Sequence, residues 1–242
     1  MSSFVQAVIK ANQEIYSALK ANDASLMQMG KMGAGGDISS GADMLCESIF
    51  VSHLSEYGTI DSEESGIIGE GKAKIIIDPL DGSSNYLSNF PYYGTSVAKI
   101  DKNGTVESAI VCNLTNGDIF IKNRDQSLSC QNILSGDIIS NKEVRDSKIG
   151  LFEKAYQYPK IVAELKKIGY KFRSPGATAL SLAYAKDVNF FLFVGKAREY
   201  DFVAGLALCE EMFTIVEDEY VIVTKEKDIF DNLNEIVNRS IK

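Results

Sequence analysis

The chain has 242 residues, of which 45% are hydrophobic and 24% are charged, so its length suits one large α/β domain or two intimately packed halves. Its formal net charge of −8 argues against a general binder of nucleic acid or of anionic membranes, because either function needs a basic face. The chain opens without a signal-peptide pattern, contains no apolar run of membrane-spanning length and has dispersed cysteines, so we expect a cytoplasmic protein with reduced thiols.

The first part of the chain predicts two helices around a glycine-rich loop. Apolar residues recur at helical spacing from Val5 to Leu19, and a second helix is predicted from Asp43 to about Tyr57. The segment between them, "MGKMGAGGDISSGAD", is expected to be a loop. Its glycines match neither GxxxxGK[ST] nor a strand-led GxGxxG, so we do not interpret it as a nucleotide-binding loop.

Strand patterns dominate the next part. The segment "AKIIID" is followed by "YGTSVAKI", "TVESAIVC" and "DIFIK". The dipeptides Asn103-Gly104 and Asn116-Gly117 separate the last three segments, and such dipeptides favour tight hairpin turns. The sequence therefore predicts an antiparallel meander.

The remainder of the chain predicts mixed structure. Helices are expected over 161–170, 177–186, 201–212 and 229–241, and short strands over 189–194 and 220–225. Blocks of helices and antiparallel strands indicate a layered α+β fold. We expect an N-terminal half, 1–135, that carries the main acidic motif, and a C-terminal half, 136–242, that contributes Asp201 and packs tightly against the first.

Two aspartates stand where the "AKIIID" strand should end. Asp78 and Asp81 bracket Pro79 and Leu80. Proline fixes φ and has no N–H, so we expect it to stop the strand and force a turn. In a turn of helical pitch, residues three apart face one side, so both carboxylates would converge with the Leu80 carbonyl between them.

Small residues follow this pair. Gly82, Ser83 and Ser84 can expose backbone N–H groups, as at an anion-binding helix N-terminus. Carboxylates that hold hard cations beside N–H groups that hold phosphate oxygens would suit metal-assisted phosphoryl transfer. The alternative is a plain hairpin turn, because Asp-Gly is a common turn dipeptide.

Further acidic residues also lie at predicted element boundaries, and each has a simpler interpretation. These are Asp61, Glu63 and Glu64 in "IDSEES", Asp37 and Asp43 in "GGDISSGAD", and Asp201 in "EYDFVAG". The first group could be a solvated acidic loop, whereas Asp43 and Asp201 could be helix-capping residues.

Taken together, these motifs resemble the inositol monophosphatase / fructose-1,6-bisphosphatase superfamily of lithium-sensitive, Mg²⁺-dependent phosphatases. "DPLDGSSN" is similar to the metal motif DPxDG[ST]xN, and "IDSEES" to an acidic loop with paired glutamates. "RSPGATAL" is similar to RSxGxxAL, and "REYDFVAG" to WDxAAG with Tyr200 in place of the usual tryptophan. The resemblance extends from the glycine-rich loop to about Glu211.

This resemblance implies a set of functional residues. The implied metal ligands are Glu63, Asp78, the Leu80 carbonyl, Asp81 and Asp201. The implied catalytic residues are Glu63 and the pair Asp43 and Ser83, which would orient and deprotonate the attacking water. The implied substrate contacts are Gly82, Ser83 and Ser84 on the phosphate and Gly176, Ala177 and Thr178 on the alcohol. Arg198 and Lys196 lie just before Asp201 in the chain, and from that place we expect them to bind a second phosphate of the substrate. For Arg198 and Lys196, a solvated basic pair is the alternative.

The resemblance also implies a layered α/β/α/β/α sandwich, often found as a homodimer, with two or three Mg²⁺ ions per active site, or Mn²⁺ in their place. The expected partner is a small phosphorylated sugar or polyol, and neither nucleic acid nor membrane is expected. Inositol-1-phosphate and fructose-1,6-bisphosphate are the first candidates. Val194 replaces the glutamate that contacts inositol in many relatives, whereas the spelling "DPLDGSSN" is typical of fructose-bisphosphatases.

Two other functions stay open. A haloacid-dehalogenase-type phosphatase also places aspartates after an apolar strand, but it needs Asp-x-Asp where this chain has Asp-x-x-Asp. A regulatory or binding homologue of the same family, with a protein or RNA-machinery partner, is the second alternative, although the acidic residues are intact.

Overall fold

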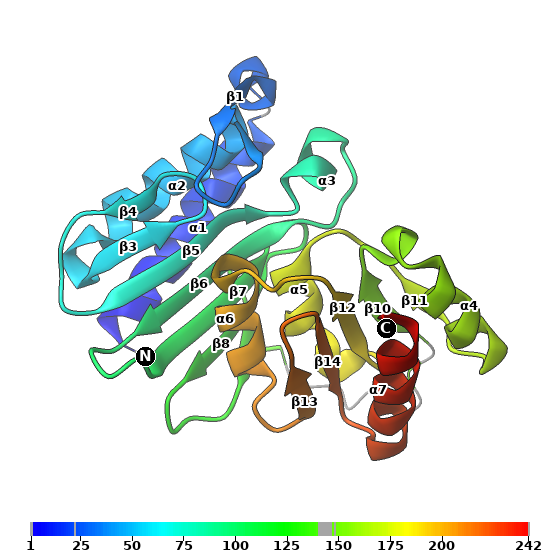
Figure 1. The fold of residues 1–242 in the computed structure, drawn as a ribbon. Helices are drawn as coiled ribbons and strands as arrows, with labels where there is room; N and C mark the ends of the chain where they lie inside the picture. Colours follow the sequence, from blue (N-terminus) through cyan, green and yellow to red (C-terminus); the bar gives the residue numbers. More distant parts are fainter. Residues whose placement is uncertain (1, 22, 140–146, 148, 242) are drawn as a thin grey trace.

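The computed structural model describes residues 2–21, 23–139, 147 and 149–241. Helices and sheets alternate in layers across the molecule (Figure 1). On the outside of the larger sheet lie α1 (Ser3–Lys20) and α2 (Gly41–Leu54). Between the two sheets lie α5 (Thr178–Ala183) and α6 (Glu199–Leu208), and α4 (Pro159–Lys167) and α7 (Lys227–Ile241) cover the smaller sheet. The predicted α/β/α/β/α sandwich is confirmed.

The larger sheet has seven strands in the order β4-β3-β5-β6-β7-β8-β9. Its strands are β3 (Thr59–Ser62), β4 (Gly66–Ile68), β5 (Lys74–Asp81), β6 (Gly94–Ile100), β7 (Val106–Asn113), β8 (Asp118–Asn123) and β9 (Ser129–Asn132). From β5 to β9, each strand is antiparallel to the next, whereas β3 and β5 are parallel. The predicted meander is therefore confirmed, and Gly104 and Gly117 take left-handed φ in its turns.

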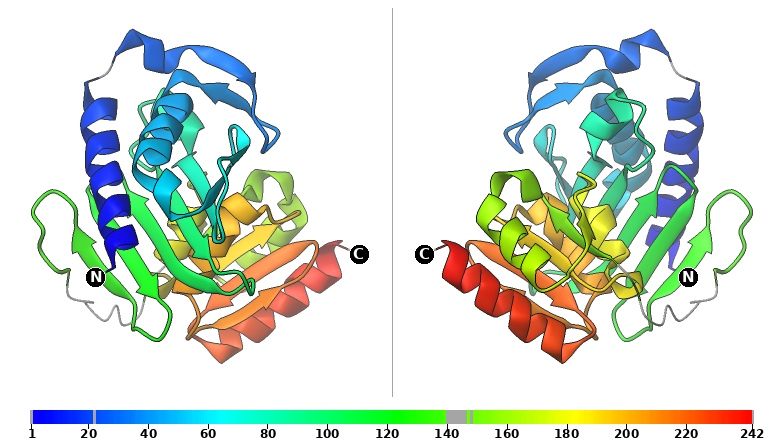
Figure 2. Two further views of the ribbon diagram at one scale, coloured as in Figure 1. Left: turned by 90° about the vertical axis from the view of Figure 1, so that its left-hand side faces the viewer. Right: turned by 90° about the vertical axis from the view of Figure 1, so that its right-hand side faces the viewer.

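The smaller sheet has five strands in the order β11-β10-β12-β14-β13. Its strands are β10 (Gly150–Glu153), β11 (Phe172–Arg173), β12 (Phe191–Val194), β13 (Phe213–Val216) and β14 (Tyr220–Thr224). The sequence predicted β12 and β14 but not the other three. The two side views show α7 lying along this sheet at the end of the molecule away from α1 (Figure 2). A domain boundary near residue 135 stays a prediction.

Short elements complete the chain. They are the helices η1 (Ala24–Met27), η2 (Ser55–Tyr57), α3 (Ser83–Leu87), η3 (Ala155–Gln157) and η4 (Ala185–Asp187), and the hairpin strands β1 (Met29–Met32) and β2 (Ile38–Ser40). The glycine-rich segment, expected to be a loop, forms this β1–β2 hairpin instead. Among the helices of the described ranges, none is both long and apolar enough to cross a membrane.

Strand β5 carries the centre of the core to the site. Ile75 and Ile77 pack into the cluster beneath α1 and α2, and Ile76 packs on the opposite face against α5 and α6. Successive side chains of a strand point to opposite faces, and both faces of this sheet are covered by helices. This explains why the strand is an uninterrupted apolar run rather than an alternating pattern.

The prediction that Pro79 stops this strand is wrong. Strand β5 continues to Asp81, and its register against β6 shifts between Asp78, which pairs with Ser96, and Asp81, which pairs with Gly94. In a regular strand, residues three apart face opposite sides, but one extra residue in a bulge restores a common side. Proline is tolerated at a bulge because no ladder bond needs its missing N–H.

Candidate functional site

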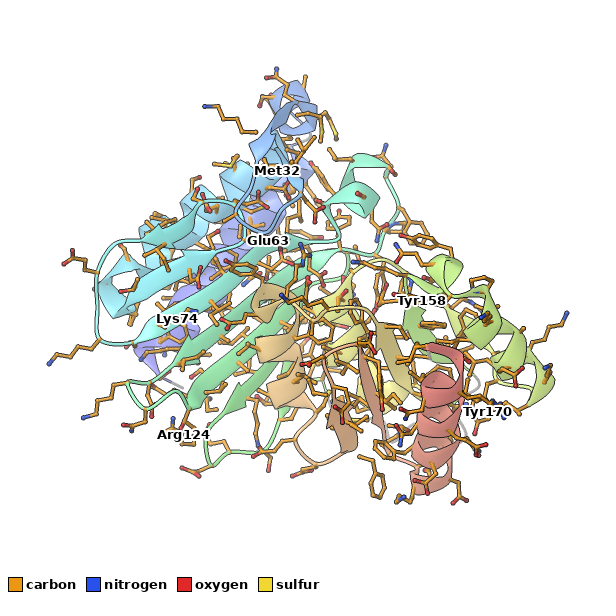
Figure 3. All side chains as sticks on the ribbon, viewed as in Figure 1. Met32, Glu63, Lys74, Arg124, Tyr158 and Tyr170 are labelled. Carbon is orange, nitrogen blue, oxygen red and sulfur yellow. The ribbon has the colours of Figure 1, made fainter. Side chains whose placement is uncertain are left out.

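Three buried carboxylates from three segments of the chain meet near the C-terminal end of β5. Glu63 follows β3, Asp78 lies on β5 and Asp201 lies in the first turn of α6. Each offers an oxygen atom, and these atoms all lie within 4.8 Å of one another. Glu63 is also held by its backbone, because its N–H donates to the Ile77 carbonyl at 3.1 Å. Figure 3 shows Glu63 between the β1–β2 hairpin, marked by Met32, and the start of α6.

The charges of this cluster are unfavourable without a cation. Burial raises the pKa of Glu63 to about 7, and repulsion from Asp201 adds to this effect although Arg198 opposes it. Burial, followed by the charges of Glu63, Asp81 and Asp201, raises the pKa of Asp78 well above its usual range. Burial, followed by the charge of Asp201, does the same to the pKa of Asp81. Buried oxygen ligands in such a group suit a hard divalent cation.

A guanidinium group lies on the cluster. Arg198 Nη1 is 2.7 Å from Glu63 Oε1 and 3.0 Å from Asp37 Oδ2. Its Nε and Nη2 donate to the two carboxylate oxygens of Asp201 at 2.8 and 3.2 Å. The interpretation of Arg198 as part of a solvated basic pair is therefore wrong, and its contact with a second phosphate stays a prediction. Lys196 is exposed.

Asp81 is tied to the helix layer between the sheets. The backbone N–H of Leu180 in α5 donates to Asp81 Oδ2 at 2.7 Å. Asp78 is held in a similar way, because its Oδ1 accepts a hydrogen bond from the Leu80 N–H at 3.0 Å. Each carboxylate therefore has one oxygen in a backbone hydrogen bond, which restricts the orientation of the side chain.

The predicted phosphate and alcohol contacts lie side by side. Gly82 has a φ of 85° and immediately precedes α3, which begins at Ser83 and continues through Ser84. A Cβ on Gly82 would lie 2.9 Å from Ala177 Cβ and 3.3 Å from the Gly176 carbonyl oxygen, so only glycine suits this position. The segment that ends in Thr178 is thus packed directly against the predicted phosphate-binding backbone.

Asn85 and Glu153 hold this loop in place. The Asn85 side-chain amide donates to the Pro175 carbonyl at 2.8 Å. The buried Glu153 carboxylate at the end of β10 accepts hydrogen bonds from the Gly176 N–H at 2.8 Å and from Ser181 Oγ at 2.5 Å. Burial raises the pKa of Glu153. Sequence reasoning missed Glu153, although an acidic residue that ends an apolar run, as in "IGLFE", repeats the pattern of "IIID".

Asp43 is the third residue of α2 and forms a capping box with the N-cap residue. Ser40 is the N-cap of α2, and Asp43 Oδ2 accepts hydrogen bonds from the Ser40 N–H at 2.6 Å and its hydroxyl at 2.7 Å. Burial raises the pKa of Asp43. Asp43 is thus a capping residue, as the simpler interpretation held, and its pairing with Ser83 stays a prediction. For Asp201, the N-cap interpretation is wrong, because Arg198 is the N-cap of α6.

The other acidic residues of "IDSEES" lie around the cluster. Asp61 accepts a hydrogen bond from the Tyr200 hydroxyl at 3.0 Å and pairs with Lys74 at 2.8 Å. Glu64 accepts a hydrogen bond from the Ser39 hydroxyl, and burial raises its pKa. These contacts show that the segment is not simply a solvated acidic loop.

The glycine-rich hairpin closes on this acidic segment. The Gly35 N–H donates to the Glu63 carbonyl and the Ala34 N–H to the Glu64 carbonyl, at 2.6 and 2.9 Å. A Cβ on Gly35 would lie 2.4 Å from Glu63 Cγ. The hairpin therefore reaches the cluster because a side chain is missing at this position.

Val194, where a glutamate was expected in an inositol phosphatase, is the last residue of β12 and is buried. It lines a cavity of about 440 Å³ together with Tyr158 and Lys196. Tyr158, which is labelled in Figure 3, immediately precedes α4. At this position the chain has an apolar side chain that neither donates nor accepts a hydrogen bond.

Several known proteins are similar to this chain in sequence or in fold. The model of the inositol monophosphatase family matches residues 2–220. Nus factor SuhB of Escherichia coli K12 is 31% identical over 88% of this chain and 83% of its own length. A fructose-1,6-bisphosphatase/inositol-1-monophosphatase of Methanothermobacter thermautotrophicus is 29% identical over 78% of this chain and 74% of its own length. An IMPase from Thermotoga maritima superposes with a TM-score of 0.78 at 20% identity, over 97% of this chain and 98% of that one, which supports the fold.

Proposed function

Because the chain belongs to the inositol monophosphatase family, we propose that it is a divalent-metal-dependent phosphatase that hydrolyses the monoester of a small sugar or polyol phosphate. The observation that carries the proposal is the convergence of Glu63, Asp78 and Asp201 within 4.8 Å. The close packing of Gly82 against Ala177 supports it, because predicted phosphate and alcohol contacts then lie together.

The residues of the cluster fit the metal that the family implies. Carboxylate and carbonyl oxygens are the ligands that Mg²⁺ prefers. These residues are buried, so few water molecules compete with their oxygens for the ion. We assign two or three Mg²⁺ ions, or Mn²⁺, to a ligand set of Glu63, Asp78, the Leu80 carbonyl, Asp81 and Asp201. When bound, such ions supply Lewis acidity: they lower the pKa of a coordinated water and offset charge on the phosphate and the leaving oxygen.

The protein's own groups orient the reactants. In the proposed reaction, backbone N–H groups of Gly82, Ser83 and Ser84 bind the phosphate oxygens. Asp43 and Ser83 hold the attacking water, and Asp43 takes its proton, for which the burial-raised pKa of this carboxyl is suited. The loop 176–178 contacts the alcohol part of the substrate and is fixed by Glu153.

The substrate belongs to the sugar and polyol phosphates, with inositol-1-phosphate and fructose-1,6-bisphosphate as first candidates. A relative whose name includes both activities, from M. thermautotrophicus, supports this pair. Val194 offers no acceptor to an inositol hydroxyl, which favours a substrate that does not require one there.

A phosphate-release assay tests the proposal. Purified protein is incubated with sugar phosphates, inositol phosphates and nucleotide bisphosphates, with Mg²⁺ or Mn²⁺ and with added Li⁺. We expect turnover on at least one sugar or polyol phosphate and loss of nearly all of it in Asp78→Asn and Asp201→Asn, while Asp228→Asn, an exposed position on α7, keeps wild-type rates. Wild-type rates in both cluster variants would show that the proposed metal site is wrong.

A binding role is the second candidate, because the E. coli relative is named as a Nus factor. In that case the wild type would be inactive over the whole panel, and tagged wild type and Asp78→Asn would retain the same protein or RNA partner. As part of the main proposal, we also propose that the protein is a homodimer and is located in the cytoplasm. Light scattering coupled to size-exclusion chromatography tests the dimer.

A further inference from the structure

Arg198 is a cationic side chain in contact with two carboxylates of the cluster, those of Glu63 and Asp201. It is the N-cap residue of α6, with an extended backbone (φ −99°, ψ 142°). Its Nε and Nη2 form two parallel bonds with Asp201, at 2.8 and 3.2 Å, while Nη1 reaches Glu63 at 2.7 Å. A planar guanidinium suits this task, because its fork matches a carboxylate and a remaining N–H can serve a second one.

The same guanidinium contacts the glycine-rich hairpin. Its Nη1 donates to the Gly35 carbonyl at 3.2 Å and to Asp37 at 3.0 Å. The Gly35 N–H in turn donates to the Glu63 carbonyl at 2.6 Å. Arg198 therefore joins the hairpin, the end of β3 and the start of α6 at one point.

A metal ion and this guanidinium need the same oxygens. Two of the three carboxylates that converge within 4.8 Å, those of Glu63 and Asp201, are paired with Arg198. A divalent ion binds carboxylate oxygens at roughly 2.0–2.6 Å, and a second cation at hydrogen-bond distance from those oxygens would repel it. Asp78 and Asp81 instead accept hydrogen bonds from backbone N–H groups, those of Leu80 and Leu180.

We propose that Arg198 is the internal counter-cation of this cluster and that divalent metal ions displace its guanidinium from Glu63 and Asp201 when they bind. Arg198 thereby stabilises the metal-free protein and weakens its affinity for metal. This inference rests on the proposed metal site. It makes Arg198 a determinant of metal affinity, in addition to any contact with substrate.

Direct metal binding tests this inference without any measurement of activity. Isothermal titration with Mn²⁺ is performed on the wild type, Arg198→Met and Arg239→Met. Arg239 is an exposed arginine on α7 paired with Glu164 at 2.8 Å, so its variant removes one positive charge far from the cluster. We expect Arg198→Met to bind Mn²⁺ about ten- to a hundredfold more tightly, the effect of removing charge-assisted hydrogen bonds from the competing state. Arg239→Met should match the wild type.

Thermal unfolding supplies a second readout. In EDTA, Arg198→Met should unfold at a lower temperature than the wild type, because Glu63 and Asp201 lose their partner. At saturating Mn²⁺ the difference should vanish or reverse. An arginine with a purely structural role would lower the unfolding temperature equally in both conditions and would leave the Mn²⁺ affinity unchanged or weaker, and that result would overturn the inference.

Arg198→Lys keeps the test decisive if Arg198→Met does not fold. Lysine retains the charge but lacks the planar fork that bridges two carboxylates. We therefore expect the Mn²⁺ affinity of Arg198→Lys to lie between the affinities of the wild type and of Arg198→Met. Affinity equal to the wild type in Arg198→Lys, with Arg198→Met unfolded, would contradict the displacement. If the wild type binds no Mn²⁺, the proposed metal site is wrong. If all variants bind Mn²⁺ with equal affinity, the metal site stands and the displacement of Arg198 is wrong.

Discussion

Replacing Asp78 by asparagine should stabilise the metal-free protein while removing its response to metal. Asp78, Glu63 and Asp201 offer oxygens within 4.8 Å of one another, and two unit charges at that separation repel by about 3.5 kcal/mol at an effective dielectric constant of about 20. Arg198 offsets part of this repulsion, and Glu63, with a pKa of about 7, is partly protonated near neutral pH. We therefore expect a net gain of roughly 1–3 kcal/mol in the free energy of unfolding.

The substitution leaves the local structure in place. Asparagine is nearly isosteric with aspartate, and its carbonyl oxygen can still accept the hydrogen bond from the Leu80 N–H. For a chain of this length, a gain of 1 kcal/mol raises the unfolding temperature by about 2–4 °C. The expected increase in EDTA near pH 8 is thus roughly 2–12 °C.

The gain should depend on pH in a defined direction. Burial and like charges raise the folded-state pKa values of Glu63, Asp78 and Asp81 above their unfolded values. Between the unfolded and folded values, the folded state holds more protons than the unfolded chain, so the stability of the metal-free wild type falls as pH rises from about 4 through about 7. The advantage of Asp78→Asn should therefore be small near pH 5 and full near pH 8.

Thermal unfolding in EDTA at both pH values, repeated with saturating Mg²⁺, measures these effects. Mg²⁺ should raise the unfolding temperature of the wild type and of the surface control Asp228→Asn but not that of Asp78→Asn. If Asp78→Asn is no more stable than the wild type in EDTA near pH 8, or if its advantage is as large near pH 5, the electrostatic reasoning is refuted.

Three further substitutions test the surroundings of the site. Glu153→Ala leaves the Gly176 N–H without its acceptor, so we expect a loss of roughly 2–4 kcal/mol in urea unfolding and a larger rise in KM than fall in kcat; unchanged KM would argue against a positioning role. Ser40→Ala removes the N-cap side chain of α2 and a hydrogen-bond partner of Asp43. We expect the free energy of unfolding to fall by about 1 kcal/mol and turnover to decrease. Unchanged turnover would show that the Ser40 hydroxyl has no part in catalysis. Gly35→Ala places a Cβ 2.4 Å from Glu63 Cγ, so Mn²⁺ titration should show weakened binding in a folded protein, whereas wild-type binding would mean that the hairpin moves aside freely.

Local patterns predicted the order of the elements well. Apolar spacing located α1, α2, α4 and α7, and the run Ile75–Ile77 located the central strand, because helix and strand periods follow from backbone geometry alone. The strands β4, β9, β10, β11 and β13 and the β1–β2 hairpin were missed. Their segments are short or rich in glycine, and pairing with a distant strand, rather than their own pattern, makes them extended.

The arrangement of the site depended on contacts that local patterns cannot contain. Gly35 and Arg198 lie 163 positions apart in the chain and are joined by a hydrogen bond of 3.2 Å. Arg198 looked like a substrate contact from its spacing to Asp201, yet its guanidinium lies on the carboxylates, because folding buries them together and their charges need an opposite charge.

The sequence by itself determined which residue types this protein offers: an apolar strand that ends in Asp78 and Asp81, and small residues after it. Tertiary structure alone decided how they converge. The bulge opposite β6 turns residues three apart in a strand to one side, and the packing of α6 against β5 and β6 brings Asp201 to them. Strand register and helix packing are set by the whole core, which is why the motif indicates which residue types lie at the site but not how they are arranged.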